Sequence, residues 1–317
     1  MSANIPLSLS ELERIRLKAR KRLPTSGTGS LVRRRLGHSL EFREHRAYQP
    51  GDDIRNVDWR ASARYGLSTD YLVRAYEAEE QFCLLVGVDV RPTMLLPRDA
   101  PKLLFARWTL LCLAHIAARE DIKAAFVPLY GPPETRVEFA AGTAIVAAAN
   151  RFAARLDQVA ASPAPQPEAL NASAMVRSLP QSSATILISD FYMAELGPLI
   201  TLVQEARRGF RQVVLCELDT WPAERALLDG QMVRLRAVGG EPARDGDFEP
   251  SESDLDKAAR AIEEQMERLR AATRLGGVIH TGWRAPAQTR STEALADAFR
   301  QWFADFAEAC ELFGRRG

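Results

Sequence analysis

The hydrophobic pattern between residues 82 and 240 alternates short apolar runs with longer amphipathic segments. The apolar runs have the length of buried strands and lie at 82–89, 122–130, 184–190, 212–218 and 232–238. The longer segments carry apolar residues at helical spacing and lie at 102–119, 143–156, 170–179 and 197–208. Strands linked by helical crossovers pair in parallel and are covered by helices on both faces. We therefore predict an α/β fold with a mostly parallel, doubly wound sheet.

The segments on either side of this alternation have different patterns. At the N-terminus we predict a helix over 11–23, capped by Ser10 and followed by a flexible Gly/Ser/Thr loop. Near the C-terminus we predict two helices, one capped by Ser253 and an aromatic one at 292–313, separated by a short strand at 278–281. The chain then divides into a basic helix and loop (1–36), a charge-rich subdomain (37–80), the sheet domain (81–245) and a C-terminal helical extension (246–317).

Composition is that of an ordinary folded protein, with 46% hydrophobic and 26% charged residues. These values exclude disordered, collagen-like and disulfide-scaffold classes. No stretch reaches the roughly 18 to 20 uncharged apolar residues of a membrane span, and the N-terminus lacks the apolar core of a secretory signal. We therefore expect no membrane span and a cytoplasmic location. The four cysteines and four histidines are scattered without metal-binding spacing.

Charge is unevenly distributed although the formal net charge is only +1. The run from Arg14 to Arg35 holds nine cations and no acid. It fits three interpretations: a solvated helix face and loop, a docking site for an acidic protein patch, or a contact to phosphate or nucleic acid. The run lacks interleaved aromatic residues and a recognition motif, which argues against nucleic acid as the partner.

Polar residues follow two of the predicted strands. Asp89, Arg91 and Thr93 come after the first strand, Asp190 ends a later one, and Thr143 begins a helix between them. Ligands of open parallel sheets bind at the carboxyl ends of the strands, so we expect the two aspartates and a threonine to converge on one crevice. Such oxygen ligands suit Mg²⁺. Arg91 has five donors and no lone pair, so it cannot ligate a cation but can pair with Asp89 or Asp190.

This arrangement resembles the von Willebrand factor A fold, a Rossmann-like architecture with a metal-ion-dependent adhesion site. That site has a D-x-S-x-S loop after the first strand, a Thr from another loop and an Asp after a later strand. Carried over by position, the resemblance assigns these ligand roles to Asp89, Thr93, Thr143 and Asp190. Arg91 replaces the first Ser, so the site is degenerate. Two states remain open: a bound Mg²⁺ ion, or a metal-free site closed by Arg91.

The most specific sequence feature is EFREHRAYQPGDDIRNVDWRASARYG at 41–66. It resembles the signature of the domain of unknown function 58 family, written roughly as E-F-x-x-x-R-x-Y-x-P-G-D-D-x-R-x-I-D-W-x-x-x-A-R. The matching residues are Glu41, Phe42, Arg46, Tyr48, Pro50, Gly51, Asp52, Asp53, Arg55, Asp58, Trp59, Ala63 and Arg64. The balanced acids and arginines of this signature fit a structural ion-pair network, a docking surface or a catalytic site.

The family resemblance implies an interaction protein rather than an enzyme. Its implied role is an adaptor or co-chaperone that works with MoxR-type AAA+ ATPases and other von Willebrand A proteins in assembling or activating other complexes. In agreement, the sequence has no Walker loop, no G-x-S-x-G and no paired histidines.

Two other functions remain as alternatives. The run LLVGVDVRPT is similar to the haloacid dehalogenase phosphohydrolase motif, with Asp89 as the nucleophile and Thr93 in place. Arg91 replaces the general acid/base of that motif, and no lysine lies between Lys123 and Lys257 to serve as its downstream cation. The third function is a nucleic-acid binder that uses the basic N-terminal arm.

Overall fold

In the structure, a computed structural model, the chain folds into two compact units. Residues 1–20 and 82–317 form one, here called the sheet unit, and residues 21–81 form the other, the inserted unit. The model describes residues 5–17, 40–48, 54–64, 71–78, 82–97, 102–120, 122–131, 137–161, 170–180, 183–193, 195–208, 211–231, 249–274, 278–287, 291–309 and 313–315. Most of the basic run, and the strand predicted at 232–238, lie outside these ranges.

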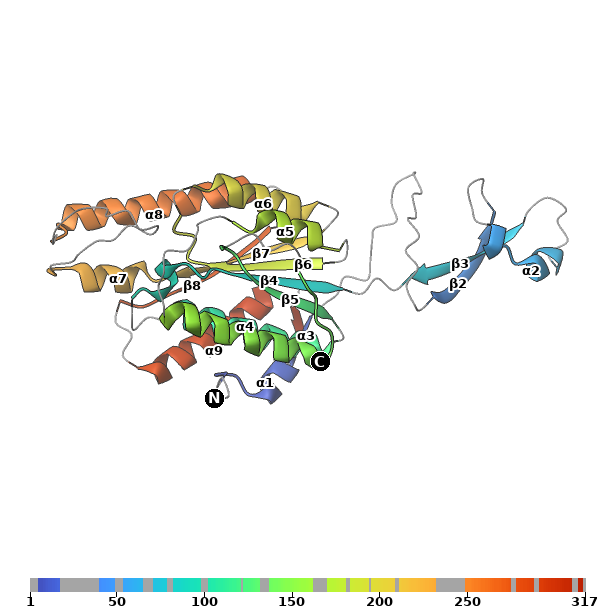
Figure 1. Cartoon of the computed structure of the whole chain (residues 1–317), viewed down its shortest axis with the longest axis horizontal. Coiled ribbons are helices and arrows are strands. Elements are labelled where there is room, and N and C mark those ends of the chain that lie inside the picture. Colours follow the sequence, from blue (N-terminus) through green and yellow to red (C-terminus); the bar gives the residue numbers. More distant parts are fainter. Residues whose placement is uncertain are drawn as a thin grey trace. The chain divides into compact units, whose positions relative to one another are not determined.

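The centre of the sheet unit is a five-stranded, all-parallel sheet (Figure 1). In spatial order its strands are β5 (Lys123–Pro128), β4 (Cys83–Val88), β6 (Ser183–Ser189), β7 (Gln212–Asp219) and β8 (Val278–Arg284). The chain runs from β4 to β5 on one side and then returns to β6 on the other side of β4. This reversal is the topological switch point of a doubly wound sheet, so the predicted fold class is confirmed.

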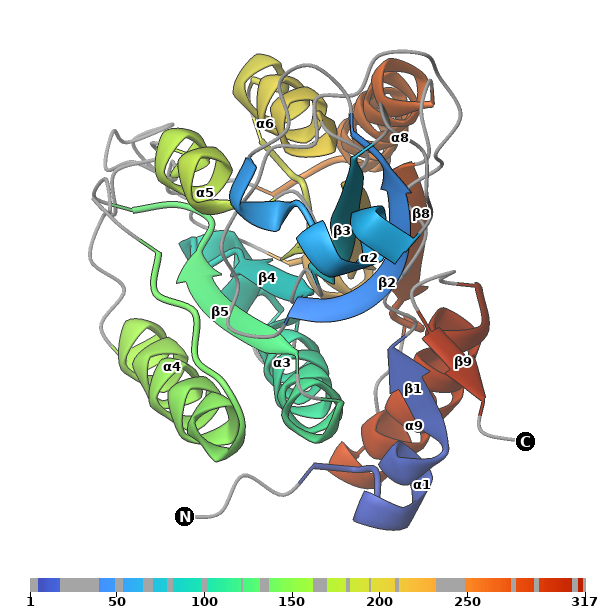
Figure 2. The same ribbon diagram turned by 90° about the vertical axis from the view of Figure 1, so that its right-hand side faces the viewer.

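Helices cover both faces of this sheet (Figures 1 and 2). On one face lie α3 (Lys102–Arg119), α4 (Thr143–Ala161) and α9 (Thr292–Ala309). On the other lie α5 (Ala172–Ser178), α6 (Gly197–Arg207) and α8 (Glu252–Thr273). Each face has its own apolar cluster, which explains why the central strands are continuous apolar runs instead of alternating ones.

Aromatic side chains fill much of the cluster beneath α9. Phe105 stacks on Trp283 with a centroid distance of 3.8 Å, and Phe299 meets Phe105 edge-on at 5.2 Å. Phe303 and Phe306 of α9 are also buried. The aromatic stripe of the last helix is therefore core, as predicted.

The N-terminal helix differs from the prediction. It is α1 (Leu9–Glu13), and its capping box is formed by Ser8 and Glu11 instead of Ser10 and Glu13. A strand follows at once: β1 (Ile15–Leu17) pairs antiparallel with β9 (Phe313–Arg315). The predicted helix had only a narrow apolar face, and pairing with a distant strand outweighs such weak local helix preference.

The C-terminal region also departs from the prediction. The cap of α8 is Ser251, with Asp254 as box partner, instead of Ser253. The short strand expected at 278–281 is the full-length edge strand β8, which pairs with β7 over seven residues. The last helix ends at Ala309, and β9 follows it. The segments after 246 therefore contribute two strands and two helices to the sheet unit.

The inserted unit contains a two-stranded antiparallel ribbon, β2 (Leu40–Ala47) and β3 (Leu72–Ala78). Between the strands are the single-turn η1 (Ile54–Asn56) and the short α2 (Trp59–Arg64).

Two further short elements belong to the sheet unit. They are the 3-10 turn η2 (Pro92–Leu95) and the helix α7 (Trp221–Leu228). Within the described ranges, no helix is long and apolar enough to cross a membrane.

Candidate functional site

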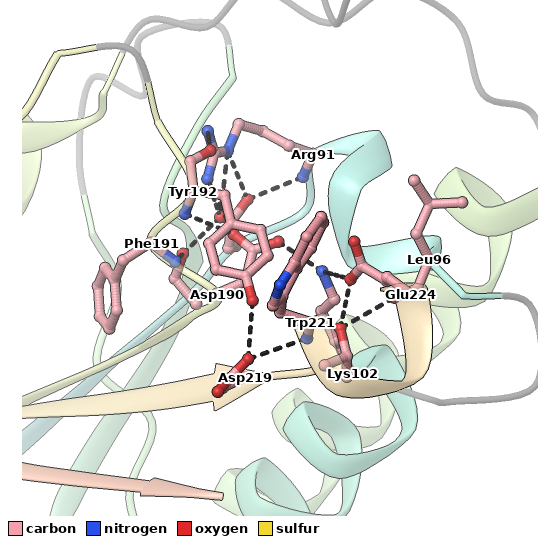
Figure 3. A network of polar contacts seen from close by, with 12 residues as sticks. Arg91, Leu96, Lys102, Asp190, Phe191, Tyr192, Asp219, Trp221 and Glu224 are labelled. Carbon is pink, nitrogen blue, oxygen red and sulfur yellow. Dashed lines mark hydrogen bonds and ion pairs between the residues drawn. The ribbon is translucent and has the colours of Figure 1, made fainter. Parts of the chain in front are cut away.

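The candidate site lies where β4 and β6 end side by side, at the switch point of the sheet. Asp89 follows β4 and Asp190 follows β6, and both side chains are completely buried. The Asp89 amide donates to the carbonyl oxygen of Ile188 at 2.8 Å, which fixes the two strand ends together. The sheet topology thus places the predicted aspartates in one network of polar contacts through Arg91, and Figure 3 shows Arg91 and Asp190 within it.

Arg91 holds the carboxylate of Asp89 from one side. Its Nε lies 3.1 Å from each carboxylate oxygen, and its Nη2 lies 2.6 Å from Oδ2. The Arg91 amide donates to Oδ1 at 2.9 Å, and the Ser189 hydroxyl donates to Oδ2 at 2.6 Å. The two oxygens of Asp89 therefore accept five hydrogen bonds from protein donors.

Arg91 also reaches the second strand end. Its Nη2 lies 3.4 Å from Asp190, and its Nη1 donates to the carbonyl oxygen of Tyr192 at 3.0 Å. The guanidinium carbon lies 4.3 Å from the centre of the Tyr130 ring, a cation–π geometry. Burial alone would lower the pKa of Arg91, but Asp89 outweighs it and the net shift is upward. Arg91 is therefore a permanently charged bridge between the two strand ends.

A second buried cation, Lys102, stands on the other side of Asp190. Its Nζ lies 2.8 Å from Asp190 and 2.9 Å from Glu224 of α7. Burial would lower the pKa of Lys102, but the charges of Asp190 and Glu224 raise it overall. The pKa of Asp190 is raised by burial more than its cationic neighbours lower it. Two cations thus bracket Asp190.

Lys102 was missed by sequence reasoning, although a signal was present. It is the first residue of α3, a largely apolar helix. A cation at a helix N-terminus opposes the helix dipole, so it needs a compensating partner. Here the partners come from β6 and α7, 88 and 122 residues further along the chain.

An outer group of contacts ties the end of β7 to the same network. The Tyr192 hydroxyl donates to Asp219 at 2.9 Å, and the Trp221 amide donates to the same oxygen at 2.9 Å. Thr220 donates to Glu224 at 2.5 Å. Figure 3 shows Tyr192 pointing from the β6 loop toward Asp219. Three adjacent strand ends are therefore locked into one arrangement.

The loop after β6 has a strained backbone. Phe191 is fully buried and has a φ of 53°, the left-handed region that non-glycine residues seldom adopt. Its amide donates to Ser189 Oγ at 2.8 Å, and its carbonyl oxygen accepts from Gln265 of α8 at 2.9 Å. Such strain persists only where surrounding contacts fix the backbone. These contacts aim Asp190 and Tyr192 into the network.

The two predicted threonines are not part of this network. The Thr93 hydroxyl in η2 is buried and makes no hydrogen bond within the described structure. Thr143 begins α4 and is exposed. No contact found among the described residues joins either hydroxyl to Asp89 or Asp190. The structure brings Asp89, Arg91 and Asp190 together and leaves the threonines outside.

The residues present do not fit a Mg²⁺ ion in this arrangement. Every oxygen of Asp89 and Asp190 already accepts from a protein donor, and Arg91 and Lys102 place two positive charges against them. A divalent cation would have to displace these charges to reach two carboxylates. Nor do the described residues contain a group of three or more His, Cys, Asp or Glu side chains placed to hold a metal.

Comparison with known proteins supplies the family. A model for proteins of unknown function, DUF58, matches residues 44–236, which is more than half of the chain. The chain belongs to the DUF58 family. The matched range includes most of the signature together with β4, β6, β7 and the network at their ends.

Other comparisons add little to the DUF58 assignment. No curated protein matches the chain. Among solved structures, the PilB minor pilin from Streptococcus sanguinis is similar at 12% sequence identity, with a TM-score of 0.30. The match covers 75% of this chain and 63% of the pilin chain.

The DUF58 signature is described only in part. Asp58 caps α2, because its Oδ1 accepts from the Ala61 amide at 3.0 Å, and its Oδ2 contacts His45 Nε2 at 3.1 Å. The Tyr48 amide donates to Tyr71 O at 2.7 Å. Trp59 is exposed, as are Arg55 and Arg64. The structure does not describe the side chains of Glu41 and Arg46, nor residues Pro50, Gly51, Asp52 and Asp53. The structural network, the docking surface and the catalytic site all stay predictions for the signature.

Proposed function

We propose that this protein is a non-catalytic interaction protein. In this proposal it acts as an adaptor or co-chaperone for a MoxR-type AAA+ ATPase, with other von Willebrand A proteins as further partners, and serves the assembly or activation of other complexes. Membership of the DUF58 family and the resemblance to von Willebrand A proteins support a MoxR-type ATPase as the partner. The buried ion pairs at the strand ends support a non-catalytic role and a degenerate adhesion site.

One observation carries the proposal: the strand-end crevice is filled by the protein's own ion pairs. Asp89 and Asp190 are each held by buried cations, and both are inaccessible to solvent. In an open α/β enzyme this is the place where substrate and cofactor enter. A site filled in this way leaves no room for a substrate, which supports a role in binding other proteins.

The same geometry opposes the phosphohydrolase alternative. A nucleophilic Asp89 would need a free oxygen facing substrate, but both of its oxygens accept hydrogen bonds from Arg91, and one also from Ser189. Arg91 cannot act as a general acid at neutral pH, because a paired guanidinium does not release its proton.

The proposal is tested by measuring binding to a purified MoxR-type ATPase from the same organism. The full chain is immobilised, and the ATPase is added with ATP, with ADP and without nucleotide. An unrelated AAA+ ATPase serves as the control for non-specific attachment. We expect saturable binding of the MoxR-type ATPase alone in at least one nucleotide state. Absence of binding in all three states contradicts the proposal.

A phosphatase assay distinguishes the adaptor hypothesis from the enzyme hypothesis. We expect no hydrolysis of p-nitrophenyl phosphate with Mg²⁺ by wild type above the level of Asp89→Asn. Turnover by the wild type that Asp89→Asn abolishes would overturn the non-catalytic part of the proposal.

A further inference from the structure

The inserted unit exposes aromatic surface that its own core does not use. Six large hydrophobic residues are exposed in the part of the chain that the structure describes, and three of them, Ile54, Trp59 and Tyr71, lie in this unit. The exposed fractions of Trp59 and Tyr71 are 58% and 50%. Their rings contact each other edge to face, with centroids 5.4 Å apart. The two rings therefore form one continuous apolar surface, not two isolated side chains.

Apolar burial between the loop elements and the ribbon is seen at one pair of side chains. Val57 and Val73 are 7% and 3% exposed and lie opposite each other across an isolated bridge. A two-stranded ribbon is at best marginally stable in water without further apolar packing. A binding partner that covered the exposed ring pair would add such packing.

The charges next to the ring pair are cationic. Arg60 and Arg64 lie one turn apart on α2, are exposed, and make no ion pair among the residues described. Asp58 is the one acid in the stretch 54–64, and its carboxylate caps α2 and contacts His45. The exposed charge on this helix is therefore positive, which is complementary to an acidic surface.

The topology also suits presentation to a partner. The inserted unit leaves the sheet unit after β1 and returns at β4, so both of its ends continue into strands of the other unit. β1 is held by pairing with β9, and β4 lies inside the five-stranded sheet. The inserted unit is therefore attached to the sheet unit at two points of the chain.

We propose that Trp59, Arg60, Arg64 and Tyr71 form a docking surface for an acidic, apolar-centred surface of a partner protein. Trp, Tyr and Arg are the residues that most often dominate binding energy at protein interfaces. The rings would enter the apolar centre of the partner site, and the arginines would pair with carboxylates at its rim. The inference rests on the proposed function, because it takes the MoxR-type ATPase as that partner.

The test measures the affinity of full-length variants for the purified ATPase. Trp59→Ala and Tyr71→Ala should each weaken binding by at least about tenfold, as expected of interface hot spots. Trp59→Phe, which keeps a ring, should retain most of the affinity. Leu227→Ala, at an equally exposed apolar residue of the sheet unit, is the matched control and should stay within about twofold of wild type.

A charge variant gives an independent measurement. Arg60→Glu with Arg64→Glu should weaken binding and flatten its dependence on salt between about 50 and 300 mM, because screening acts on the rim contacts. Circular dichroism of each variant checks that the fold is retained.

The possible failures are distinguishable. If the wild type does not bind the ATPase, both the proposed function and this inference are overturned. If the wild type binds and the Trp59, Tyr71 and arginine variants bind equally well, the inference alone is overturned. Light scattering adds a third outcome: a wild-type dimer that Trp59→Ala dissociates would assign the surface to a second copy of the chain and contradict the acidic partner.

Discussion

At the scale of single residues, the notable feature is a set of charged side chains buried without solvent. Arg91 and Lys102 face Asp89 and Asp190 at contact distance, and each of these four residues is at most 4% exposed. Taking these charges out of water is costly, and their mutual attraction offsets that cost only while every partner is present. The network therefore specifies one arrangement of strand ends rather than adding much net stability.

Removing one partner should be far more harmful than removing an exposed charge. Arg91→Met leaves Asp89 buried with only Ser189 as a side-chain partner, and we expect the free energy of unfolding to fall by about 3–5 kcal/mol. Arg208→Met, which breaks an exposed pair with Glu205, should cost less than about 1 kcal/mol. Urea denaturation followed by circular dichroism measures both. Equal costs for the two variants would show that the buried network is not energetically coupled.

Tyr192 should make stability depend on alkaline pH. Burial and the neighbouring Asp219 raise the pKa of this phenol, so the folded protein keeps its proton where the unfolded chain loses it, above about pH 10. The folded state therefore loses stability as pH rises, by about 1.4 kcal/mol per pH unit from this group. Tyr192→Phe lacks this loss.

The measurement compares unfolding free energies of wild type and Tyr192→Phe from pH 8 to 11. Tyr192→Phe should be less stable than wild type at pH 8, since it lacks the hydrogen bond to Asp219, and its deficit should shrink above about pH 10. A constant deficit for Tyr192→Phe would contradict the assignment.

At the scale of elements, capping residues set where the short helices begin. α2 has only six residues and no buried side chain, so its own packing contributes little to holding it. Asp58 satisfies the amide of Ala61, and its carbonyl oxygen accepts from the Ser62 hydroxyl at 2.7 Å. Ser62 in turn accepts from the Leu72 amide at 2.9 Å, which links the helix to β3. The Asp of the signature therefore acts as the start of α2.

Loss of the cap should loosen α2 without affecting the sheet. Asp58→Ala should increase amide hydrogen exchange across 59–64 about fivefold, which corresponds to a cap contribution of about 1 kcal/mol. Asp58→Asn keeps a good capping side chain and should exchange close to the wild-type rate. Peptide-level exchange by mass spectrometry measures both, with β6 as an internal reference. Equal exchange in Ala and Asn variants would rule out a capping role.

At the scale of the whole molecule, distant segments complete the sheet unit. Arg119 of α3 donates to the Leu12 carbonyl oxygen at 3.0 Å and also to that of Ile15. Arg300 of α9 donates to the Pro6 carbonyl oxygen at 2.9 Å. Together with the β1–β9 pairing, these contacts make the N-terminal segment part of the main core and leave residues 21–81 between two fixed points.

The two leucines of α1 test whether this segment belongs to the core. Leu12 is 2% exposed and lies in the large apolar cluster, whereas Leu9 is 63% exposed on the same helix. Leu12→Ala should lower the free energy of unfolding by about 2–5 kcal/mol. Leu9→Ala should stay within about 0.5 kcal/mol of wild type. Similar effects at both positions in urea denaturation would mean that α1 does not pack on the sheet unit.

The sequence by itself determined the α/β class, the strands at 82–89, 122–130, 184–190 and 212–218, and the family signature. These follow from local patterns, because a strand covered on both faces must be apolar throughout and a signature is a run of fixed residues. The sequence also predicted that Asp89 and Asp190 would converge with a threonine, since the carboxyl ends of parallel strands share one edge, and that Arg91 could pair with either aspartate. The aspartates and Arg91 do meet, but neither threonine joins them.

Other features depend on contacts between segments far apart in the chain and are visible only in the tertiary structure. Lys102, Glu224 and Tyr192 join the network across large sequence separations, and no local pattern encodes such distances. β1 stands at residues 15–17 of a predicted helix because its partner, β9, lies at the other end of the chain. β8 lies beside β7 in the described sheet, and this position depends on packing of whole elements rather than on any single run.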